Sequence, residues 1–168
     1  LNTLKHQPAK VAAIEGIWST ERGAPLLLFG LPDEATRSNR YALGIPRGAS
    51  LVLTHELDGL LRGLDEFPGK HPPVAPVFWS FRIMVGVGLL MLAASWWTAW
   101  QLRPARPARK RATGRTPDLS PWSARLLVIL SFSGWIATLA GWYVTEIGRQ
   151  PWLVYGVLTT AQAVGPIG

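Results

Sequence analysis

The pattern of hydrophobic and polar residues divides the chain into a mixed N-terminal part and two long apolar runs. Residues 83–102 and residues 126–145 each form 20 consecutive positions without a charged side chain. A helix rises 1.5 Å per residue, so each run gives a helix about 30 Å long, which matches the hydrocarbon core of a bilayer. The runs therefore predict two membrane-spanning helices. Two buried helices of a soluble protein are the alternative, although such helices seldom stay uncharged on every face over this length.

The segment between the two runs carries most of the net positive charge. Positions 103–115 hold six of the 17 Lys and Arg residues, whereas residues 1–77 hold eight basic and eight acidic side chains. Short loops rich in Lys and Arg are typical of the cytoplasmic side of a membrane. A nucleic-acid-binding or nuclear-localisation run is the alternative, but a membrane-flanking loop needs no further assumption. Residues 1–77 and 146–168 are then predicted to share the opposite side, which is the periplasm in a bacterium.

Composition excludes several kinds of site within this chain. Charged residues make up 16% of it, against about 25% in soluble domains. The absence of Cys excludes disulfides, thiolate-bound metals and thiolate-ligated haem. Because the charge of +7 belongs mainly to one loop, we expect membrane lipid and no nucleic acid as a partner. The headgroup region favours amphipathic rings, and six Trp residues lie near the ends of the apolar runs: Trp79, Trp96, Trp97, Trp100, Trp122 and Trp142.

These features predict an all-α integral membrane fold, an antiparallel transmembrane helix pair with an extended outer loop. The predicted segments are an outer segment (1–77), a transmembrane helix (78–102), a basic cytoplasmic loop (103–121), a second transmembrane helix (122–150) ending in the GRQPW motif, and a second outer segment (151–168). Gly134, Thr138, Gly141 and Thr145 form a stripe of small residues that lets another helix approach closely. The pair is therefore expected to be a fragment of a larger helical bundle.

Ionisable residues stand at the predicted outer edge of both spans. Arg82 opens the first run, and Glu146 follows the second. Ionisable groups at such positions are costly and are candidates for function. For Arg82 the structural alternative is snorkelling to the interface. Arg149 is three residues after Glu146, so the two side chains could simply pair on one helical face.

Met84 lies just inside the first span. Gly88 and Met91 follow it at i+4 and i+7, so one helical face carries a thioether beside a bare backbone patch. A flat macrocycle could lie on such a face, and Met is an axial haem ligand in some cytochromes. Ordinary packing is the alternative role for a methionine in a membrane core.

Several motifs together resemble subunit I of the cytochrome bd family of quinol oxidases. They are FWSFRIMVGVG (78–88) and GWYVTEIGRQPWLVYG (141–156), with QPAKVAAIEGIW (7–18) and ERGAPLLLFG (21–30) resembling the quinol-binding outer loop, or Q-loop. About 60 residues separate Glu15 from Phe78, which is similar to the short-loop variant associated with cyanide-insensitive oxidases. The resemblance implies a C-terminal-side fragment of that subunit, inactive on its own, with a periplasmic Q-loop.

The resemblance assigns roles to six residues. It implies that Met84 is the axial ligand of a low-spin haem b, and that Arg82 supports this haem. It implies that Glu146 is the ligand of a high-spin haem iron, with Arg149 in the same motif. Lys10 and Glu15 match the Q-loop residues implicated in quinol oxidation. On a helix these two lie about 140° apart, so they could flank a ligand; a surface charge pair is the alternative.

The implied activity is that of a quinol:oxygen oxidoreductase in a respiratory chain. The subunit would oxidise ubiquinol or menaquinol at the periplasmic side and pass electrons through haems to reduce O2 to water, contributing to the proton-motive force. Its cofactors would be low-spin and high-spin haem b and either haem d or a further haem b. Its partners would be quinol, O2, subunit II and lipid, in a multi-pass protein of the bacterial plasma membrane. A non-catalytic helix-hairpin subunit or a transporter fragment is the alternative.

Overall fold

The computed structural model describes residues 2–103 and 119–164. Most of the predicted basic loop and residues 165–168 of the second outer segment lie outside the described residues. The chain divides into two compact units, one formed by residues 1–82 and 140–168 and the other by residues 83–139.

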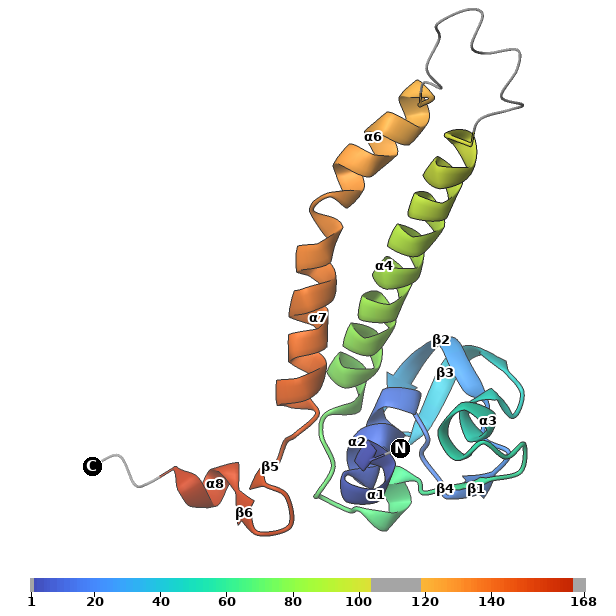
Figure 1. Cartoon of the computed structure of the whole chain (residues 1–168). Coiled ribbons are helices and arrows are strands. Elements are labelled where there is room, and N and C mark those ends of the chain that lie inside the picture. The colour runs from blue at the N-terminus through green and yellow to red at the C-terminus, as the bar shows by residue number, and fades with distance from the viewer. Residues whose placement is uncertain (1, 104–118, 165–168) are drawn as a thin grey trace, which may run out of the picture. The chain divides into compact units, whose positions relative to one another are not determined.

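Short helices and strands make up the N-terminal part of the first unit (Figure 1). They are α1 (Asn2–His6), α2 (Pro8–Glu15), β1 (Glu21–Arg22), β2 (Leu26–Asp33), β3 (Ser38–Ile45), α3 (Gly48–Thr54), β4 (Leu60–Leu61) and the 3-10 helix η1 (Leu64–Glu66). The strands pair antiparallel, β1 with β4 and β2 with β3. The prediction of an all-α fold with an extended outer loop therefore needs correction: the outer segment is a small mixed α and β structure.

Helix α2 lies at the centre of this unit. Its Pro8 occupies the first turn, where the missing N–H costs nothing. It ends at Gly16, whose φ of 70° falls in the left-handed region that glycine tolerates. One apolar core holds this helix against the rest of the unit, and its members include Ala12, Ala13, Ile17, Leu61, Leu64, Val74 and Val77.

The β2–β3 hairpin shows why the pattern of hydrophobic and polar residues did not predict these strands. Its register runs from Leu26 opposite Ile45 to Asp33 opposite Ser38, with two irregularities along β2. The irregularities interrupt the strict alternation of buried and exposed side chains that marks a strand. At the turn, Asp33 accepts hydrogen bonds from the Ala35 and Thr36 amides at 3.0 and 3.3 Å. The hairpin is thus set by local turn chemistry and tertiary packing.

The first apolar run forms α4 (Val74–Gln101), a helix of 28 residues. The Val74 amide at its start donates to Glu34 Oε1 in the β2–β3 turn at 2.8 Å. That bond satisfies one of the amides that a helix start leaves without a partner. The helix start is therefore tied to a residue 40 positions earlier in the chain.

The second apolar run forms two consecutive helices, α6 (Pro121–Leu130) and α7 (Ser133–Ile147). The Ser120 side chain caps α6 by accepting from the Ser123 amide at 3.2 Å. Ser131 and Phe132 separate the helices, and the Ser131 hydroxyl donates to the Val128 carbonyl at 2.6 Å. Serine hydroxyls that bond back to the preceding turn often bend helices.

Both apolar segments are long enough to cross a bilayer, at 28 residues for Val74–Gln101 and 27 for Pro121–Ile147. Many of their large apolar side chains are exposed in the described structure, among them Leu89, Leu92, Val128 and Ile129. Such exposure suits helices surrounded by lipid or by further helices. Beyond α7 the chain forms β5 (Trp152–Val154), β6 (Leu158–Thr159) and α8 (Thr160–Ala163).

Candidate functional site

The structure places the six predicted site residues in three different environments. Glu15 lies beside Arg82, Lys10 lies near Glu146 and Arg149, and Met84 lies further along α4. The two residues assigned to quinol oxidation therefore do not lie apart from the four residues assigned to haem binding. Instead, each predicted quinol residue has charged neighbours from the predicted haem set.

Arg82 is almost buried, and its hydrogen-bond acceptors among the described residues are all backbone carbonyls. Its side chain is 11% exposed. Nε and Nη2 donate to the Leu27 carbonyl at 3.0 and 2.6 Å, while Nη1 donates to the Ile14 carbonyl at 2.7 Å and to the Phe78 carbonyl at 3.0 Å. The guanidinium also stacks on the Phe78 ring, 3.3 Å from its centroid. A residue of α4 thus joins α2 and β2 through one planar group.

Glu15 is the buried carboxylate of this site, with a side chain only 7% exposed. Its Oε2 lies 3.9 Å from Arg82 Nη2, and among the described residues that oxygen has no hydrogen-bond partner. Burial raises the pKa of the Glu15 carboxyl above its ordinary value, and the Arg82 guanidinium opposes part of the rise. A buried oxygen without a partner is costly, so this carboxylate is poised for an external hydrogen-bond donor.

A cavity of about 300 Å³ adjoins Glu15, and we call it the Glu15 pocket. Its wall combines the end of α2 with the β2–β3 hairpin, and the residues include Glu15, Trp18, Glu21, Leu27, Arg37 and Asn39. The volume is at the lower end of the range for small-molecule sites. Aromatic, apolar and charged side chains meet there, as ligand pockets require.

Asn39 and Trp18 are pocket residues that the sequence did not single out. The Asn39 amide donates to the Gly16 carbonyl at 2.8 Å, and its oxygen accepts from the Trp18 indole nitrogen at 3.0 Å. This network fixes the Trp18 ring in the pocket wall. A lone Asn in an unrecognised strand gives no sequence signal, because its partners are 21 and 23 positions away.

Lys10 does not line the Glu15 pocket in the described structure. It lies over the end of α7, where a Cβ added at Gly148 would be 3.0 Å from Lys10 Cε. Burial lowers the pKa of the Lys10 ammonium, Arg149 lowers it further, and Glu146 acts in the opposite direction. Lys10 and Glu15 belong to one helix but face different neighbours, as their 140° separation predicts.

Glu146 and Arg149 form an ion pair at the end of α7. Arg149 Nη2 lies 3.3 Å from Glu146 Oε1, and both side chains are nearly half exposed. The pairing that their i, i+3 spacing offered as an alternative to a functional role is present in the structure. An accessible carboxylate of this kind can also coordinate an iron or another cation, so the pair and a ligand role are compatible.

Met84 is partly buried on α4, beside a bare stretch of helix. A Cβ added at Gly86 or Gly88 would meet no heavy atom of the described residues within 4 Å. Gly88 lies one turn beyond Met84 on the same side of the helix, and this open glycine face together with the thioether fits a flat macrocycle bound along the helix. Within residues 2–103 and 119–164, no three His, Cys, Asp or Glu side chains gather in a metal-binding cluster.

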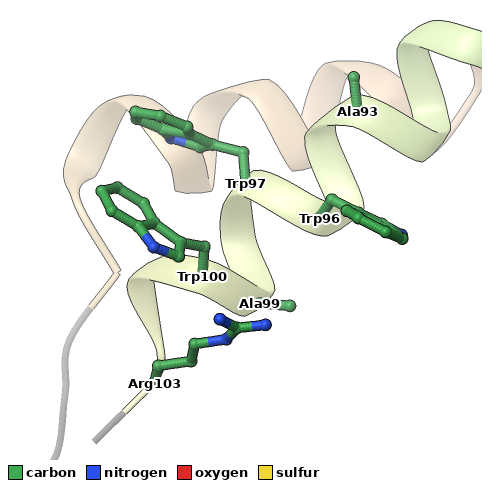
Figure 2. Close-up of a pocket in the computed structure, with 6 residues that line it drawn as sticks. All are labelled: Ala93, Trp96, Trp97, Ala99, Trp100 and Arg103. Atoms are coloured by element: carbon green, nitrogen blue, oxygen red, sulfur yellow. The ribbon is translucent and has the colours of Figure 1, made fainter. Parts of the chain in front are cut away.

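A cavity of about 610 Å³ lies near the end of α4. Figure 2 shows the Trp97 and Trp100 rings next to each other, with Trp96 on another side of the helix and the Arg103 side chain near Ala99. The two neighbouring rings have centroids 5.4 Å apart. Trp and Arg at a helix end are the residues expected at a membrane interface.

Comparison with known proteins identifies relatives of the whole chain. The sequence profile described as cytochrome bd terminal oxidase subunit I matches residues 1–168. Cytochrome bd ubiquinol oxidase subunit 1 of Bacillus subtilis (strain 168) is 34% identical over 97% of this chain and 35% of its own length. Cytochrome bd-II ubiquinol oxidase subunit 1 of Escherichia coli (strain K12) is 29% identical over 94% of this chain and 42% of its own length.

A solved structure is also similar. The bd oxidase from Geobacillus thermodenitrificans matches with a TM-score of 0.72 and 33% sequence identity, over 95% of this chain and 35% of that chain. The present chain therefore spans roughly a third of the length of these relatives.

Proposed function

The chain belongs to the family of cytochrome bd terminal oxidase subunit I, and from this premise we propose that it forms part of a quinol oxidase that reduces O2 to water. The proposal covers the activity of the longer protein, because the chain spans about a third of its relatives. The quinol, O2, subunit II and the contribution to the proton-motive force all belong to that proposal. The fragment alone is expected to be inactive.

The observation that carries the proposal is the buried Glu15 carboxylate, one oxygen of which has no hydrogen-bond partner within the described part of the chain, at the edge of a 300 Å³ pocket. A quinol is a flat ring whose hydroxyl groups donate hydrogen bonds and must release protons on oxidation. Trp18 and Leu27 supply pocket surfaces suited to a ring, and Glu15 supplies the acceptor. We therefore assign quinol binding to the Glu15 pocket.

Glu15 would act as the proton acceptor for the quinol hydroxyl. A general base works best when its pKa lies near the operating pH. Burial raises the pKa of Glu15 in that direction, so the carboxylate binds a proton more readily than an exposed one does. The nearby Arg82 keeps the ionised form available for the next turnover by opposing part of the rise.

Lys10 would act at the edge of the site rather than within the pocket. Its ammonium group has Glu146 and Arg149 as charged neighbours. We infer that Lys10 adjusts the field around Glu146, which the family resemblance assigns to a haem iron. The resemblance also gives Lys10 a direct role with quinol. A quinol bound between Lys10 and Glu15 would be compatible with this direct role and with the effect of Lys10 on Glu146.

Met84, Glu146 and Arg149 are the residues that would hold haem. Met84 offers a thioether beside the open glycine face, Glu146 a carboxylate and Arg149 a cation suited to a propionate. A thioether ligand raises the reduction potential of a haem, and the bound haem groups would supply the electron transfer. The haem types, low-spin and high-spin haem b with haem d or a third haem b, are part of the proposal.

The two apolar helices fit a bacterial membrane protein. We propose that they form an antiparallel pair within a larger bundle in the plasma membrane. The outer segment would then face the periplasm as the Q-loop, and the residues between α4 and α6 would face the cytoplasm by the positive-inside rule.

Glu15→Gln in the full-length oxidase tests this function. Glutamine keeps the size of the side chain but accepts no proton, so we expect quinol oxidation to fall by about 100-fold or more. The reduced-minus-oxidised haem spectrum should not change. Glu56→Gln, at an exposed carboxylate outside the pocket, is the matched control and should keep wild-type activity. Wild-type rates in Glu15→Gln would refute the assignment of the base, and a full-length protein without haem would refute the oxidase.

A further inference from the structure

We propose that Arg82 is a positioning residue that fastens the outer segment to the start of α4 and so holds Glu15 in place beside its pocket. The inference rests on the proposed role of Glu15 in quinol oxidation. It differs from the haem-supporting role that the resemblance implies, since it concerns what Arg82 touches within the first unit.

The acceptors of Arg82 are the parts of the backbone that frame the Glu15 pocket. Ile14, whose carbonyl accepts from Nη1 at 2.7 Å, directly precedes Glu15. Leu27, whose carbonyl accepts from Nε and Nη2, belongs to the pocket wall. One side chain of α4 thereby fixes the distance between the end of α2 and the start of β2, which are the two sides of the pocket.

The geometry uses the planar fork of arginine as well as its charge. Three nitrogens donate to carbonyls in three separate stretches of chain, and the Phe78 ring supports the plane from below. An ammonium group is a compact charge on a flexible stem and cannot span these acceptors together. A charged group this deeply buried is also costly unless its donors are satisfied. Arg82 is therefore a fixed element of the fold.

The charge of Arg82 has a second effect on Glu15. Nη2 lies 3.9 Å from Glu15 Oε2, too far for a hydrogen bond. Arg82 thus stabilises the carboxylate from a distance and leaves its oxygen available to a ligand. A closer Arg82 would occupy that oxygen.

The test compares Arg82→Gln and Arg82→Lys in the full-length holoenzyme. We expect Arg82→Gln to raise KM for quinol by about tenfold or more, because three carbonyls lose the guanidinium as a donor and the pocket loosens. Arg82→Lys, which keeps the charge but not the fork, should give an intermediate rise. Trypsin should cleave the outer segment after Arg22 and Arg37 faster in both variants. The low-spin haem b spectrum should remain.

Arg62→Gln is the matched control, because Arg62 is an exposed arginine of the same unit paired with Glu66 at 3.6 Å. It should leave KM and the cleavage rate unchanged. If an Arg82 variant fails to assemble, Phe78→Leu keeps Arg82 and all its acceptors and removes the ring that stacks on the guanidinium and packs against Gly16 and Gly30. It should raise KM and the cleavage rate in the same direction by a smaller factor.

Two results would overturn the proposal. One is an Arg82→Gln or Phe78→Leu enzyme with wild-type KM and cleavage rate. The other is an Arg82→Lys enzyme identical to wild type together with an Arg82→Gln enzyme in which only the haem potential changes. That combination would mean that the charge of Arg82 is sufficient and that its planar fork positions nothing. A wild-type enzyme whose haem is not reduced by quinol would refute the proposed function itself, whatever the variants do.

Discussion

At the scale of single residues, the arrangement is governed by where each charge finds its partner. Arg82 turns to the carbonyls of Ile14, Leu27 and Phe78. Glu15 keeps one oxygen without a hydrogen-bond partner among the described residues. Burial makes the ionised carboxylate bind a proton more readily than an exposed one does, and a proton acceptor for quinol needs that property.

The pKa of Glu15 leads to a prediction on pH dependence. The folded protein raises this pKa above its ordinary value of 4.5, so Glu15 becomes protonated at a higher pH than an exposed glutamate. Only the ionised form accepts a proton, and quinol oxidation should therefore fall as pH decreases through the raised pKa. The measurement is kcat/KM for quinol against pH in the full-length enzyme. An acid limb at or below pH 4.5, or an unchanged limb in Glu15→Gln, would contradict it.

Met84 gives a second prediction at this scale. Met84→Leu keeps the volume of the side chain but removes the sulfur ligand. In the full-length enzyme we expect loss of the low-spin haem b signal from the reduced-minus-oxidised spectrum. Met91→Leu, one heptad further along α4, is the control and should retain the signal. A normal spectrum in Met84→Leu would exclude Met84 as a ligand.

At the scale of elements, the outer segment is held together by close contacts among α2, the β2–β3 hairpin and α4. Phe78 of α4 is fully buried and packs against Gly16 at the end of α2. A Cβ added at Gly30 in β2 would lie 3.5 Å from the same ring. Glu34 of the hairpin turn accepts from the first amide of α4. Each element of the pocket is therefore positioned by the start of α4.

Gly16→Ala should destabilise this junction. An added Cβ would be 3.0 Å from the Phe78 ring, and the φ of 70° disfavours a side chain. We expect a loss of about 1–2 kcal/mol in the free energy of local unfolding, measured by hydrogen exchange of the α2 amides. Gly69→Ala is the matched control, because its φ is 68° and no described heavy atom lies within 4 Å of the added Cβ. Equal losses in both variants would mean that packing on Phe78 contributes nothing.

At the scale of the whole molecule, the chain divides into two compact units, one rich in polar contacts and one formed mainly by apolar helices. The first unit has its own core, built on Ala12, Ala13, Leu61 and Val74. In the second, Gln101 Oε1 accepts from the Ser123 hydroxyl at 3.0 Å, which joins the end of α4 to α6. The proposed oxidase needs both kinds of structure: a pocket in contact with water and helices that hold haem in lipid.

The proposed topology can be measured on intact cells. The chain contains no Cys, so single cysteines can be introduced against a clean background once any elsewhere in the full-length protein are removed. Tyr41→Cys, at a position 80% exposed on β3, should react with an impermeant thiol reagent from outside. Thr116→Cys, in the basic loop, should react only after the membrane is made permeable. The reverse labelling pattern would invert the proposed orientation.

Much of this protein was predictable from its sequence, for a physical reason. Twenty uncharged residues in a row have few stable environments, so the two apolar runs predict long helices without any knowledge of the rest of the chain. The i, i+3 spacing of Glu146 and Arg149 likewise indicates that they can pair, and the pair forms although Arg149 lies in the turn just beyond the end of α7. The motifs around Met84 and Glu146 were enough to indicate the family.

Only the tertiary structure decided how the charged residues combine and where the pocket lies. The partners of Arg82 on α2 and β2 are 68 and 55 positions away, and no periodicity encodes them. The strands were missed because irregular pairing hides their alternation, and Asn39 was missed with them. Short-range patterns depend on local geometry that the chain always has, whereas the Glu15 pocket depends on which distant carbonyls satisfy one buried guanidinium.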